Sequence, residues 1–533
     1  MQSEELPAAV LTRLSRLAPD QRAAATAPAG PVLCVAPAGS GKTTTVVARL
    51  AWRVAGGADP GSICALTFNR AAADELQQRA DAALGELGHE AGCVRVRTFH
   101  ALGREILADA GVDVTRIVER SKLLAEIAGG PLPAGQLRAL DDAFTRLKLD
   151  PERAPGPEDV ETHAAFVAYQ EHLRKTGSID LDDLVALAGP TLRADQALLG
   201  RWRARAAVLF VDEAQDLDRS QLDLALLLAG ERRDIFLVGD DDQTIYAWRL
   251  ADVRRVLGLA ARLPGLRRVD LQTNHRCAPE IVQRAARLVE HNRERFDKVI
   301  AASPRNAGEV RLLADTGDEV ARARLLLRAW AAEPPAERHA VLARTNRELV
   351  PYAAAALELG LAYHAVDDGL LLEDVALLAV LGSLDAERPP LLAAPDAAKA
   401  ARLSAEQTAT LLGWAAGAPT VEQLRDTVAE RREARAQLRR EDALLTLATA
   451  HGTKGLEWDH VACVGHDAGV FPSGRALREA DDPARVLEEE RRLAYVAWTR
   501  ARRTLTIVYD PGAPSTFLLE AFDPWELDGA GPG

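Results

Sequence analysis

The sequence predicts an α/β protein with doubly wound parallel sheets, and three observations support this prediction. Short apolar runs rich in β-branched residues alternate with longer segments of helical periodicity. Polar and glycine-containing clusters follow several of these runs, and in parallel sheets such clusters gather at the carboxyl edge, where ligands bind. The chain has 533 residues, which is more than one domain needs, so we expect several buried cores.

The composition is typical of a large globular protein without a disulfide framework. The five cysteines lie far apart and form no Cys-x-x-Cys pair, which argues against a zinc or iron–sulfur site. The first residues lack a signal-peptide pattern, and no apolar run is long enough to span a bilayer. We therefore expect a cytoplasmic protein with no membrane partner. The net charge of -13 does not exclude nucleic acid, because affinity depends on the charge of a local groove.

The stretch from Val32 to Thr45 predicts a nucleotide site. An apolar strand, a glycine turn and a helix start follow one another, which aims backbone N–H groups at an anion. Lys42 would reach the β- and γ-phosphates of ATP, and the Thr43 hydroxyl would bind Mg²⁺. Ala36 replaces the usual first glycine, and an ordinary glycine turn is the alternative. The loop residues expected to surround the nucleotide are Ala38, Gly39, Ser40, Gly41, Lys42, Thr43 and Thr44.

The first half of the chain repeats the pattern of a strand, a polar cluster and a helix. Further examples lie at 62–79, 94–107, 206–216 and 234–249. The interval 106–190 instead has helical periodicity, with prolines and glycines and no convincing strand. We therefore expect a first core formed by residues 1–105 and 191–265, interrupted by a helical insertion at 106–190.

A second alternating set indicates a second core. Its expected strand segments are 267–276, 309–315, 339–346, 361–366, 443–458, 460–465 and 504–509. The interval 375–442 is again helical. We therefore expect a second core at 266–374 and 443–525, a short helical insertion at 375–442 and a disordered tail at 526–533.

Two adjacent carboxylates follow the predicted strand at 208–211. Asp212 can hold Mg²⁺ directly or through water, and Glu213 can orient and deprotonate the water that attacks the nucleotide. A lone Asp-Glu pair could also cap a helix. The phosphate loop upstream favours the catalytic interpretation.

Ten short motifs occur in a fixed order along nearly the whole chain: PDQ, AGSGKT, LTFNRAAADEL, RTFHAL, VDEAQD, VGDDDQTIYAWR, NHR, ARTN, TAHGTKGLEWD and EEERRLAYVAWTRA. With these motifs the sequence resembles UvrD/Rep-type DNA helicases of superfamily one. The resemblance implies two RecA-like parallel-sheet cores, each interrupted by a mainly helical insertion. It also implies ATP-driven movement with Mg²⁺, usually 3′ to 5′ along single-stranded DNA, with duplex unwinding at single-strand/duplex junctions and a role in DNA repair or recombination.

The same resemblance assigns residues to the base and the ribose of ATP. Gln21 matches the residue that reads the adenine edge, and Glu457 matches the one that contacts the ribose. His275 stands where the family commonly has a tyrosine that stacks on adenine. Histidine can still stack on the base, so the strictness of the adenine preference stays open.

Three further residues match groups that act on the γ-phosphate. Gln243 resembles the γ-phosphate sensor that couples nucleotide state to the DNA site. Arg276 and Arg500, both expected in the second core, match arginines that stabilise the charge spreading over the phosphoryl oxygens. The resemblance thus implies that catalysis requires closure of the two cores.

The DNA-facing candidates are aromatic residues beside small polar groups. Aromatic faces stack on bases of any sequence, at ~1–3 kcal/mol each, and polar groups contact phosphates. The aromatic candidates are Phe68, Phe99, Tyr246 and Trp248, and core packing is the alternative for the two phenylalanines. The polar candidates are Thr67, Asn69, Arg70, Thr98, His100, Arg249, His451, Thr453 and Lys454.

Three functions remain open from the sequence. The favoured one is an autonomous 3′–5′ helicase or translocase. The others are a motor subunit of a multi-protein nuclease or phage-defence complex with little autonomous unwinding, and an ATP-switched regulatory protein without hydrolysis. The presence of Lys42, Glu213, Gln243, Arg276 and Arg500 argues against the last. A nuclease or repair factor is the expected kind of protein partner, since nothing after residue 509 resembles a nuclease.

The second insertion is shorter than in the longer family members, and its function has two interpretations. Its arginines could hold the phosphates of a duplex, or ERREARAQLRRED could form a solvated, ion-paired helix, which we favour slightly. We therefore expect robust translocation but weak unwinding of long duplexes by the lone chain.

Overall fold

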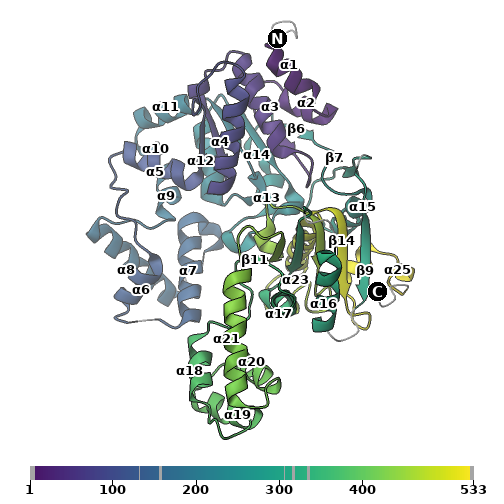
Figure 1. Cartoon of the computed structure of the whole chain (residues 1–533). Coiled ribbons are helices and arrows are strands. Elements are labelled where there is room, and N and C mark those ends of the chain that lie inside the picture. The colour runs from purple at the N-terminus through teal and green to yellow at the C-terminus, as the bar shows by residue number, and fades with distance from the viewer. Residues whose placement is uncertain are drawn as a thin grey trace. The chain divides into compact units, whose positions relative to one another are not determined.

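The computed structural model describes residues 6–130, 132–154, 156, 159–304, 306–314, 319–332 and 336–528. The chain divides into two compact units, each with one six-stranded parallel sheet (Figure 1). Unit 1 comprises Met1–Arg276 and Asn292–Ser303, and unit 2 comprises Cys277–His291 and Pro304–Gly533. The predicted α/β class with two parallel-sheet cores is thereby confirmed. No helix in the described part of the chain is long and apolar enough to cross a membrane.

The sheet of unit 1 forms from the apolar runs expected to be strands. Its strands are, in sheet order, β3 (Arg95–Thr98), β2 (Ile63–Thr67), β4 (Val208–Val211), β5 (Ile235–Gly239), β1 (Val32–Val35) and β6 (Arg267–Asp270). The four central strands are buried at every position, as expected for parallel strands covered on both faces. Alternate residues of β1 face opposite cores, with Leu33 and Val35 on one side and Val32 and Cys34 on the other.

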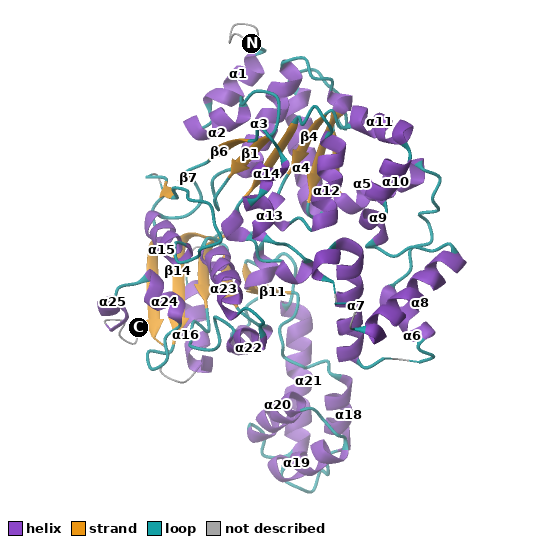
Figure 2. Ribbon diagram, turned by 180° about the vertical axis from the view of Figure 1, so that it is seen from behind, coloured by secondary structure: helices purple, strands orange, loops and turns teal. Residues whose placement is uncertain are grey.

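Helices cover both faces of this sheet (Figure 2). One face is covered by α1 (Ala8–Ser15), α2 (Pro19–Ala25), α3 (Lys42–Ala55) and α4 (Arg70–Gly85). The other is covered by α5 (Phe99–Asp109), α9 (Asp183–Ala186), α10 (Ala188–Ala194), α11 (Gln196–Arg205), α12 (Arg219–Ala229), α13 (Val253–Leu257) and α14 (Leu259–Arg262). A small parallel pair, β7 (Thr273–Asn274) and β8 (Ala301–Ala302), also lies in unit 1.

The first insertion packs around a core of its own. It contains α6 (Arg120–Ile127), α7 (Ala134–Leu149) and α8 (Val160–Thr176). Phe144 and Tyr169 are fully buried in this small core. Val185 and Ala188 instead join the core beside the sheet. The self-contained insertion is thus narrower than the expected 106–190.

A buried ion cluster joins α7 to the start of α9 and to the segment that precedes it. The Lys148 ammonium donates to Asp180 Oδ2 (2.8 Å) and to Asp183 Oδ1 (2.7 Å), and all three side chains are almost fully buried. Arg120 donates to the same Asp180 oxygen (2.9 Å). Burial of charge is tolerated here because each group has partners.

The sheet of unit 2 has the same architecture. Its strands are, in sheet order, β11 (Tyr363–Ala365), β12 (Leu445–Thr449), β10 (His339–Ala343), β13 (Trp458–Cys463), β14 (Ala501–Tyr509) and β9 (Glu309–Ala314). Its helices are α15 (Pro279–Val289), α16 (Glu319–Ala331), α17 (Val350–Glu358), α22 (Gly474–Glu479), α23 (Pro483–Trp498), α24 (Thr516–Ala521) and α25 (Pro524–Asp528).

The second insertion is a small helical lobe at the end of a long helix (Figure 1). It contains α18 (Val375–Ser383), α19 (Pro390–Ala400), α20 (Ala405–Ala416) and α21 (Val421–Leu438), which share one apolar core. Arg432 pairs with Glu373 (2.8 Å) and Arg435 pairs with Asp368 (2.7 Å). These ion pairs within the chain favour the interpretation of an ion-paired helix over that of arginines that hold the phosphates of a duplex.

Two expected boundaries are wrong. The segment 267–276 does not open the second core, because β6 pairs in parallel with β1, with Arg267 beside Val32. As an edge strand with two exposed arginines, β6 lacks the apolar run that marks a buried strand. Arg276 therefore lies in unit 1. The expected disordered tail is wrong for 526–528, which belong to α25, where Glu526 binds Arg284 (3.0 Å); residues 529–533 lie outside the described residues.

Candidate functional site

The phosphate loop joins β1 to α3 through a turn that two glycines make possible. Gly39 and Gly41 have φ values of +70° and +81°, in the left-handed region that favours glycine. A Cβ on Gly39 would lie 2.5 Å from Asn274 Oδ1, and one on Gly41 would lie 2.5 Å from Gln21 Nε2. The loop therefore needs glycine both for its backbone shape and for the side chains packed against it.

Gln21 reaches the phosphate loop from the first turn of α2. Its Nε2 donates to Ser40 O (2.8 Å), and its Oε1 accepts from Ala18 N (3.1 Å). Pro19 occupies the first turn of this helix, as the sequence predicts. The structure thus brings the expected adenine-reading residue against the loop.

Glu213 stands beside Lys42 at the end of β4. Lys42 Nζ lies 4.0 Å from Glu213 Oε2, and both side chains are only partly exposed. Glu213 has φ +51°, a conformation that is costly for a residue with a side chain and that is concentrated at functional sites. Its backbone N donates to Asp212 Oδ1 (2.9 Å). Glu213 therefore lies beside the loop lysine, and Asp212 is bonded to the backbone of Glu213.

Gln215 connects Glu213 to the strand end after β5. Its Nε2 donates to Glu213 Oε2 (2.6 Å), and its Oε1 accepts from Asp240 N (3.1 Å). A Cβ on Gly239 would lie 2.3 Å from the same Oε1, so a larger residue there would displace the Gln215 amide. Asp240 Oδ2 in turn accepts from Gln243 Nε2 (2.8 Å). Sequence reasoning did not assign Gln215, although its place in VDEAQD was a usable signal.

Lys298 was also missed, and it neutralises the aspartates before Gln243. Its fully buried ammonium lies 2.7 Å from Asp240 Oδ1 and 2.9 Å from Asp242 Oδ2, and it also binds Asp241. Arg295 donates twice to Asp242 (2.8 and 3.1 Å). The scarcity of lysine could have pointed to Lys298, since the chain has only seven lysines among 65 lysine and arginine residues.

The segment after β7 lies against the phosphate loop. His275 N donates to Gly39 O (2.8 Å), and Arg276 N donates to Asn274 Oδ1 (2.8 Å). These contacts bring the predicted base-stacking and charge-stabilising residues to the loop within unit 1. The sequence analysis assigned Arg276 to the second core because it assigned the segment 267–276, which contains β6, to that core.

Arg500 and Glu457 lie in unit 2. The Arg500 guanidinium is buried, and it donates from Nε to Val496 O (2.9 Å) and from Nη1 to Leu456 O (3.2 Å). Glu457 pairs with Arg502. Arg500 is therefore held by the end of α23 and by the residue before Glu457, and Glu457 is held by a residue of β14.

Three aromatic side chains gather where β2 and β5 end. Phe68 and Tyr246 stack with ring centroids 5.1 Å apart and planes within 9°. Trp248 meets Tyr246 edge-on at 6.1 Å, and the Arg249 guanidinium carbon lies 4.6 Å from the Trp248 ring centroid. Trp248 is 61% exposed. An exposed aromatic face beside a cation is a suitable surface for an unpaired base.

Burial removes three residues from the predicted DNA track. Phe99 is 1% exposed and packs in the core with Leu102 and Ile106, so its expected stacking on DNA is wrong. Thr67 is fully buried and its hydroxyl donates to Asn69 O (3.1 Å). Thr453 is likewise buried, with its hydroxyl bonded to its own turn.

Two other polar candidates serve as helix caps. Asn69 Oδ1 accepts from Ala72 N (2.8 Å) at the start of α4, and Thr98 Oγ1 accepts from Ala101 N (3.2 Å) at the start of α5. Capping explains these residue types at these positions without any ligand. Arg70 remains exposed beside Asp74.

The two candidate histidines are held neutral. Burial lowers the pKa of His100, and burial together with the nearby Arg344 lowers the pKa of His451 to about 4. At neutral pH neither side chain therefore carries a positive charge. Lys454 is the half-buried cation of the predicted second-core track.

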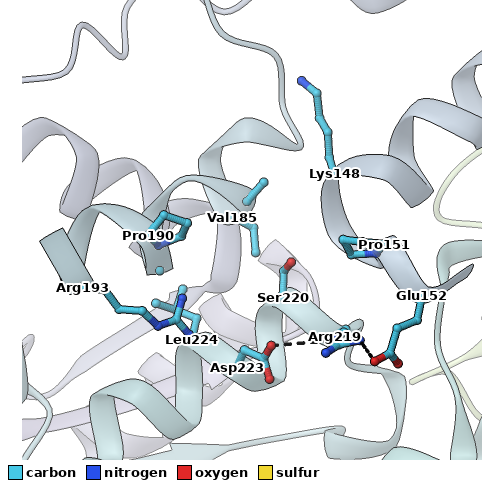
Figure 3. A pocket seen from close by; sticks show the side chains of 12 residues that line it. Lys148, Pro151, Glu152, Val185, Pro190, Arg193, Arg219, Ser220, Asp223 and Leu224 are labelled. Carbon is cyan, nitrogen blue, oxygen red and sulfur yellow. Dashed lines mark ion pairs between the residues drawn. The ribbon is translucent and has the colours of Figure 1, made fainter. Parts of the chain in front are cut away.

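A separate cavity of about 460 Å³ in unit 1 is lined by residues of the first insertion and its neighbours (Figure 3). Arg219 there pairs with Glu152 and with Asp223, and Lys148 is bound to the aspartates described above. Two of the cations that line the cavity thus already have carboxylate partners. None of the nucleotide candidates lines this cavity.

Comparison with known proteins matches both halves of the chain to one family. Residues 17–264 match the UvrD/REP helicase N-terminal domain, and residues 422–511 match the UvrD-like helicase C-terminal domain. The ATP-dependent DNA helicase UvrD2 of Mycobacterium tuberculosis is 31% identical, over 93% of this chain and 80% of that protein. The ATP-dependent DNA helicase Rep of Escherichia coli is 27% identical, over 95% and 94%.

A third relative, DNA helicase II of Escherichia coli, is 26% identical over 93% of this chain and 84% of its own length. The similarity therefore extends across both sheets and both insertions. From these matches, and from the phosphate loop that they contain, we conclude that the chain belongs to the UvrD/Rep helicase family.

Proposed function

We propose that this protein is an ATP-dependent DNA helicase that moves 3′ to 5′ along single-stranded DNA. The observation that supports it most directly is the hydrogen-bonded path from Glu213, beside Lys42, through Gln215 and Asp240 to Gln243. Three residues after Gln243 the chain reaches Tyr246 and the aromatic cluster. Glu213, which is suited to hydrolysis, is thus linked through a few hydrogen bonds and three residues of chain to an aromatic surface suited to binding bases.

The residues around the phosphate loop fit a magnesium nucleotide. The left-handed glycines give the loop the shape of an anion-binding nest at the start of α3. The described residues contain no group of three or more His, Cys, Asp or Glu able to hold a metal. Mg²⁺ needs no such cage, because it binds through substrate phosphates, water and one or two side chains. Thr43 and Asp212 would supply these, and the bound ion would neutralise phosphate charge.

Glu213 is the proposed general base. Its carboxylate is held by Gln215 and flanked by Lys42, and in this position it would orient a water and accept its proton. Gln243 would report on the γ-phosphate, and Arg276 and Arg500 would stabilise the charge that develops during transfer. Gln21, His275 and Glu457 are proposed to bind the base and ribose.

Trp248, Tyr246 and Phe68 are proposed to stack on successive bases, because stacking needs no particular sequence. Arg70, Arg249 and Lys454 would neutralise phosphates, and His100 and His451 would contribute hydrogen bonds. A motor that moves along DNA needs this kind of contact, since base-specific hydrogen bonds would stop it at preferred sites.

The test is ATP hydrolysis with and without single-stranded DNA, followed by strand displacement on 3′-tailed and 5′-tailed duplexes. We expect hydrolysis that DNA stimulates and displacement from the 3′-tailed substrate only. Glu213→Gln serves as the control, because hydrolysis or displacement that persists in this variant would come from a contaminating enzyme. Hydrolysis that DNA does not change, or displacement from the 5′ tail alone, would contradict the proposal.

The small second insertion leads us to expect weak unwinding of long duplexes by a single copy. Movement can be measured separately, as displacement of streptavidin from a biotinylated single strand. Efficient unwinding of long 3′-tailed duplexes by verified monomers would contradict this expectation while leaving translocation intact.

A further inference from the structure

A buried charge cluster lies directly behind Gln243, formed by a segment remote in sequence. Asp240, Asp241 and Asp242 are almost completely inaccessible to solvent, and so is the ammonium of Lys298 that binds all three. Arg295 donates from two nitrogens to Asp242. Both cations come from one arm of the chain, Asn292–Ser303.

The cluster is close to electrical balance only because this arm is present. Burial alone would lower the pKa of Lys298, but the three carboxylates raise it above the ordinary range. Burial raises the pKa of Asp241 to about 6, with Lys298 opposing the shift and the neighbouring aspartates adding to it. Without Lys298, three adjacent carboxylates would lie in a medium that penalises even one unpaired charge.

Asp240 connects this cluster to the predicted γ-phosphate sensor. One of its carboxylate oxygens accepts from Lys298, and the other accepts from Gln243 Nε2 (2.8 Å). Its backbone N donates to Gln215, which binds Glu213. The Asp240 carboxylate is therefore held by Lys298 and by Asp242 N at one oxygen and bonded to the Gln243 amide at the other.

The arm is a continuation of α15, a helix of unit 2, although the arm itself belongs to unit 1. Its strand β8 pairs with β7, with Ala301 beside Thr273. The residues after β7 contact the phosphate loop, as shown by the bond from His275 N to Gly39 O (2.8 Å). Both ends of this helix therefore continue into segments of unit 1: the segment before it hydrogen-bonds to the phosphate loop, and the arm after it binds the aspartates.

We infer that Lys298 is a positioning residue that couples ATP hydrolysis to the DNA track by holding Asp240 and, through it, Gln243. The inference rests on the proposed helicase function and adds to it a residue that touches neither ATP nor DNA. Buried ionic groups are not in general stabilising compared with apolar packing. This cluster instead fixes one arrangement of the segment from 240 to 246, which links hydrolysis to the aromatic surface.

The main test is Lys298→Met, compared with Lys148→Met as a matched control. Both lysines are buried and bind aspartates in unit 1, but Lys148 has no bond to the path through Gln243. Three quantities are measured: kcat for ATP hydrolysis and KM for ATP, both with saturating oligo(dT), and the ratio of oligo(dT) affinities with and without a non-hydrolysable ATP analogue. Thermal unfolding of each variant reports the structural cost.

For Lys298→Met we expect kcat to fall about 10- to 100-fold, as for misplaced catalytic groups, with KM for ATP within about twofold of the parent. The affinity ratio should approach one, because nucleotide state no longer reaches the DNA surface. Lys148→Met should lose thermal stability while keeping the parental kcat and ratio. The inference is overturned if Lys298→Met keeps the parental kcat and the parental affinity ratio. It is also overturned if Lys148→Met loses the parental kcat and the parental affinity ratio.

A charge-balanced variant keeps the test decisive if Lys298→Met unfolds. Lys298→Met combined with Asp241→Asn removes one cation and one carboxylate together, so the local charge stays as in the parent. We expect this double variant to fold and still to lack coupling, since the bond from Lys298 to Asp240 is gone. Restored coupling would show that neutralisation alone is needed and would overturn the positioning role. Absence of DNA-stimulated hydrolysis in the parent would instead refute the proposed function, and the inference with it.

Discussion

Replacing Trp248 with alanine should weaken single-strand binding without disturbing the fold. Trp248 is 61% exposed, and its ring contacts are an edge-on pair with Tyr246 and a cation over its face, so truncation should cost at most about 1 kcal/mol of stability. One lost base stack is worth ~1–3 kcal/mol, which corresponds to roughly 5- to 150-fold in affinity.

The assay is fluorescence anisotropy with labelled oligo(dT) and oligo(dA) at one fixed salt concentration, since salt alone changes such affinities. The matched control is Trp525→Ala, which truncates another exposed tryptophan (72% exposed) in α25, outside the predicted DNA track. Both oligonucleotides should lose similar affinity for the Trp248 variant, and DNA-stimulated hydrolysis should fall while basal hydrolysis remains. A folded Trp248→Ala protein with the parental affinity and stimulation would refute the stacking role.

Three further predictions concern hydrolysis and stability. Lys42→Ala should abolish hydrolysis, whereas Glu213→Gln should stop hydrolysis but retain ATP binding; a parental rate in either variant, with DNA present, contradicts that residue's role. Arg500→Ala should lower kcat far more than ATP affinity, so a change confined to affinity contradicts a transition-state role. Burial lowers the pKa of His466 to about 3, and its Nε2 accepts from Trp498, so the unfolded state binds the extra proton. Protonation of His466 in the unfolded state should therefore lower the free energy of unfolding by about 2 kcal/mol from pH 7.5 to 5. Urea unfolding of His466→Gln should lack this contribution, and a variant with the parental pH dependence would contradict the role of His466.

The parts of the fold that sequence predicted well are those that local patterns encode. Buried parallel strands such as β1 and β5 are continuous apolar runs, and the glycine turn after β1 has few structural alternatives. The meeting of Lys42 with Glu213 also follows from topology, because both leave the carboxyl edge of one sheet. The segment 267–276 was expected as a strand but assigned to the wrong core, because the pairing of β6 with β1 joins residues 235 positions apart in the sequence and no local pattern encodes it.

What the sequence could not predict depends on contacts between remote segments. Phe99 follows a polar strand end, like Phe68, yet one side chain enters the core and the other stacks on Tyr246. No local pattern distinguishes the two, since the difference lies in the partners that each ring meets from distant parts of the chain. The scarcity of lysine could have drawn attention to Lys298, but its role depends on three aspartates 56 to 58 residues earlier, which no local pattern links to it.

The arm that carries Lys298 has a consequence for how the protein is made on the ribosome. Lys298 is synthesised 58 residues after Asp240, which at 5–20 residues per second is a delay of roughly 3–12 s. When Asp240 is made, the strands of the nascent first sheet from β1 to β5 are complete, and β6 follows within the interval, but the cation that the aspartates require comes last. The first sheet should therefore stay loosely assembled until Lys298 has been translated, and a nascent chain halted near Arg276 should be more open to proteases and chaperones than one extended past Ser303.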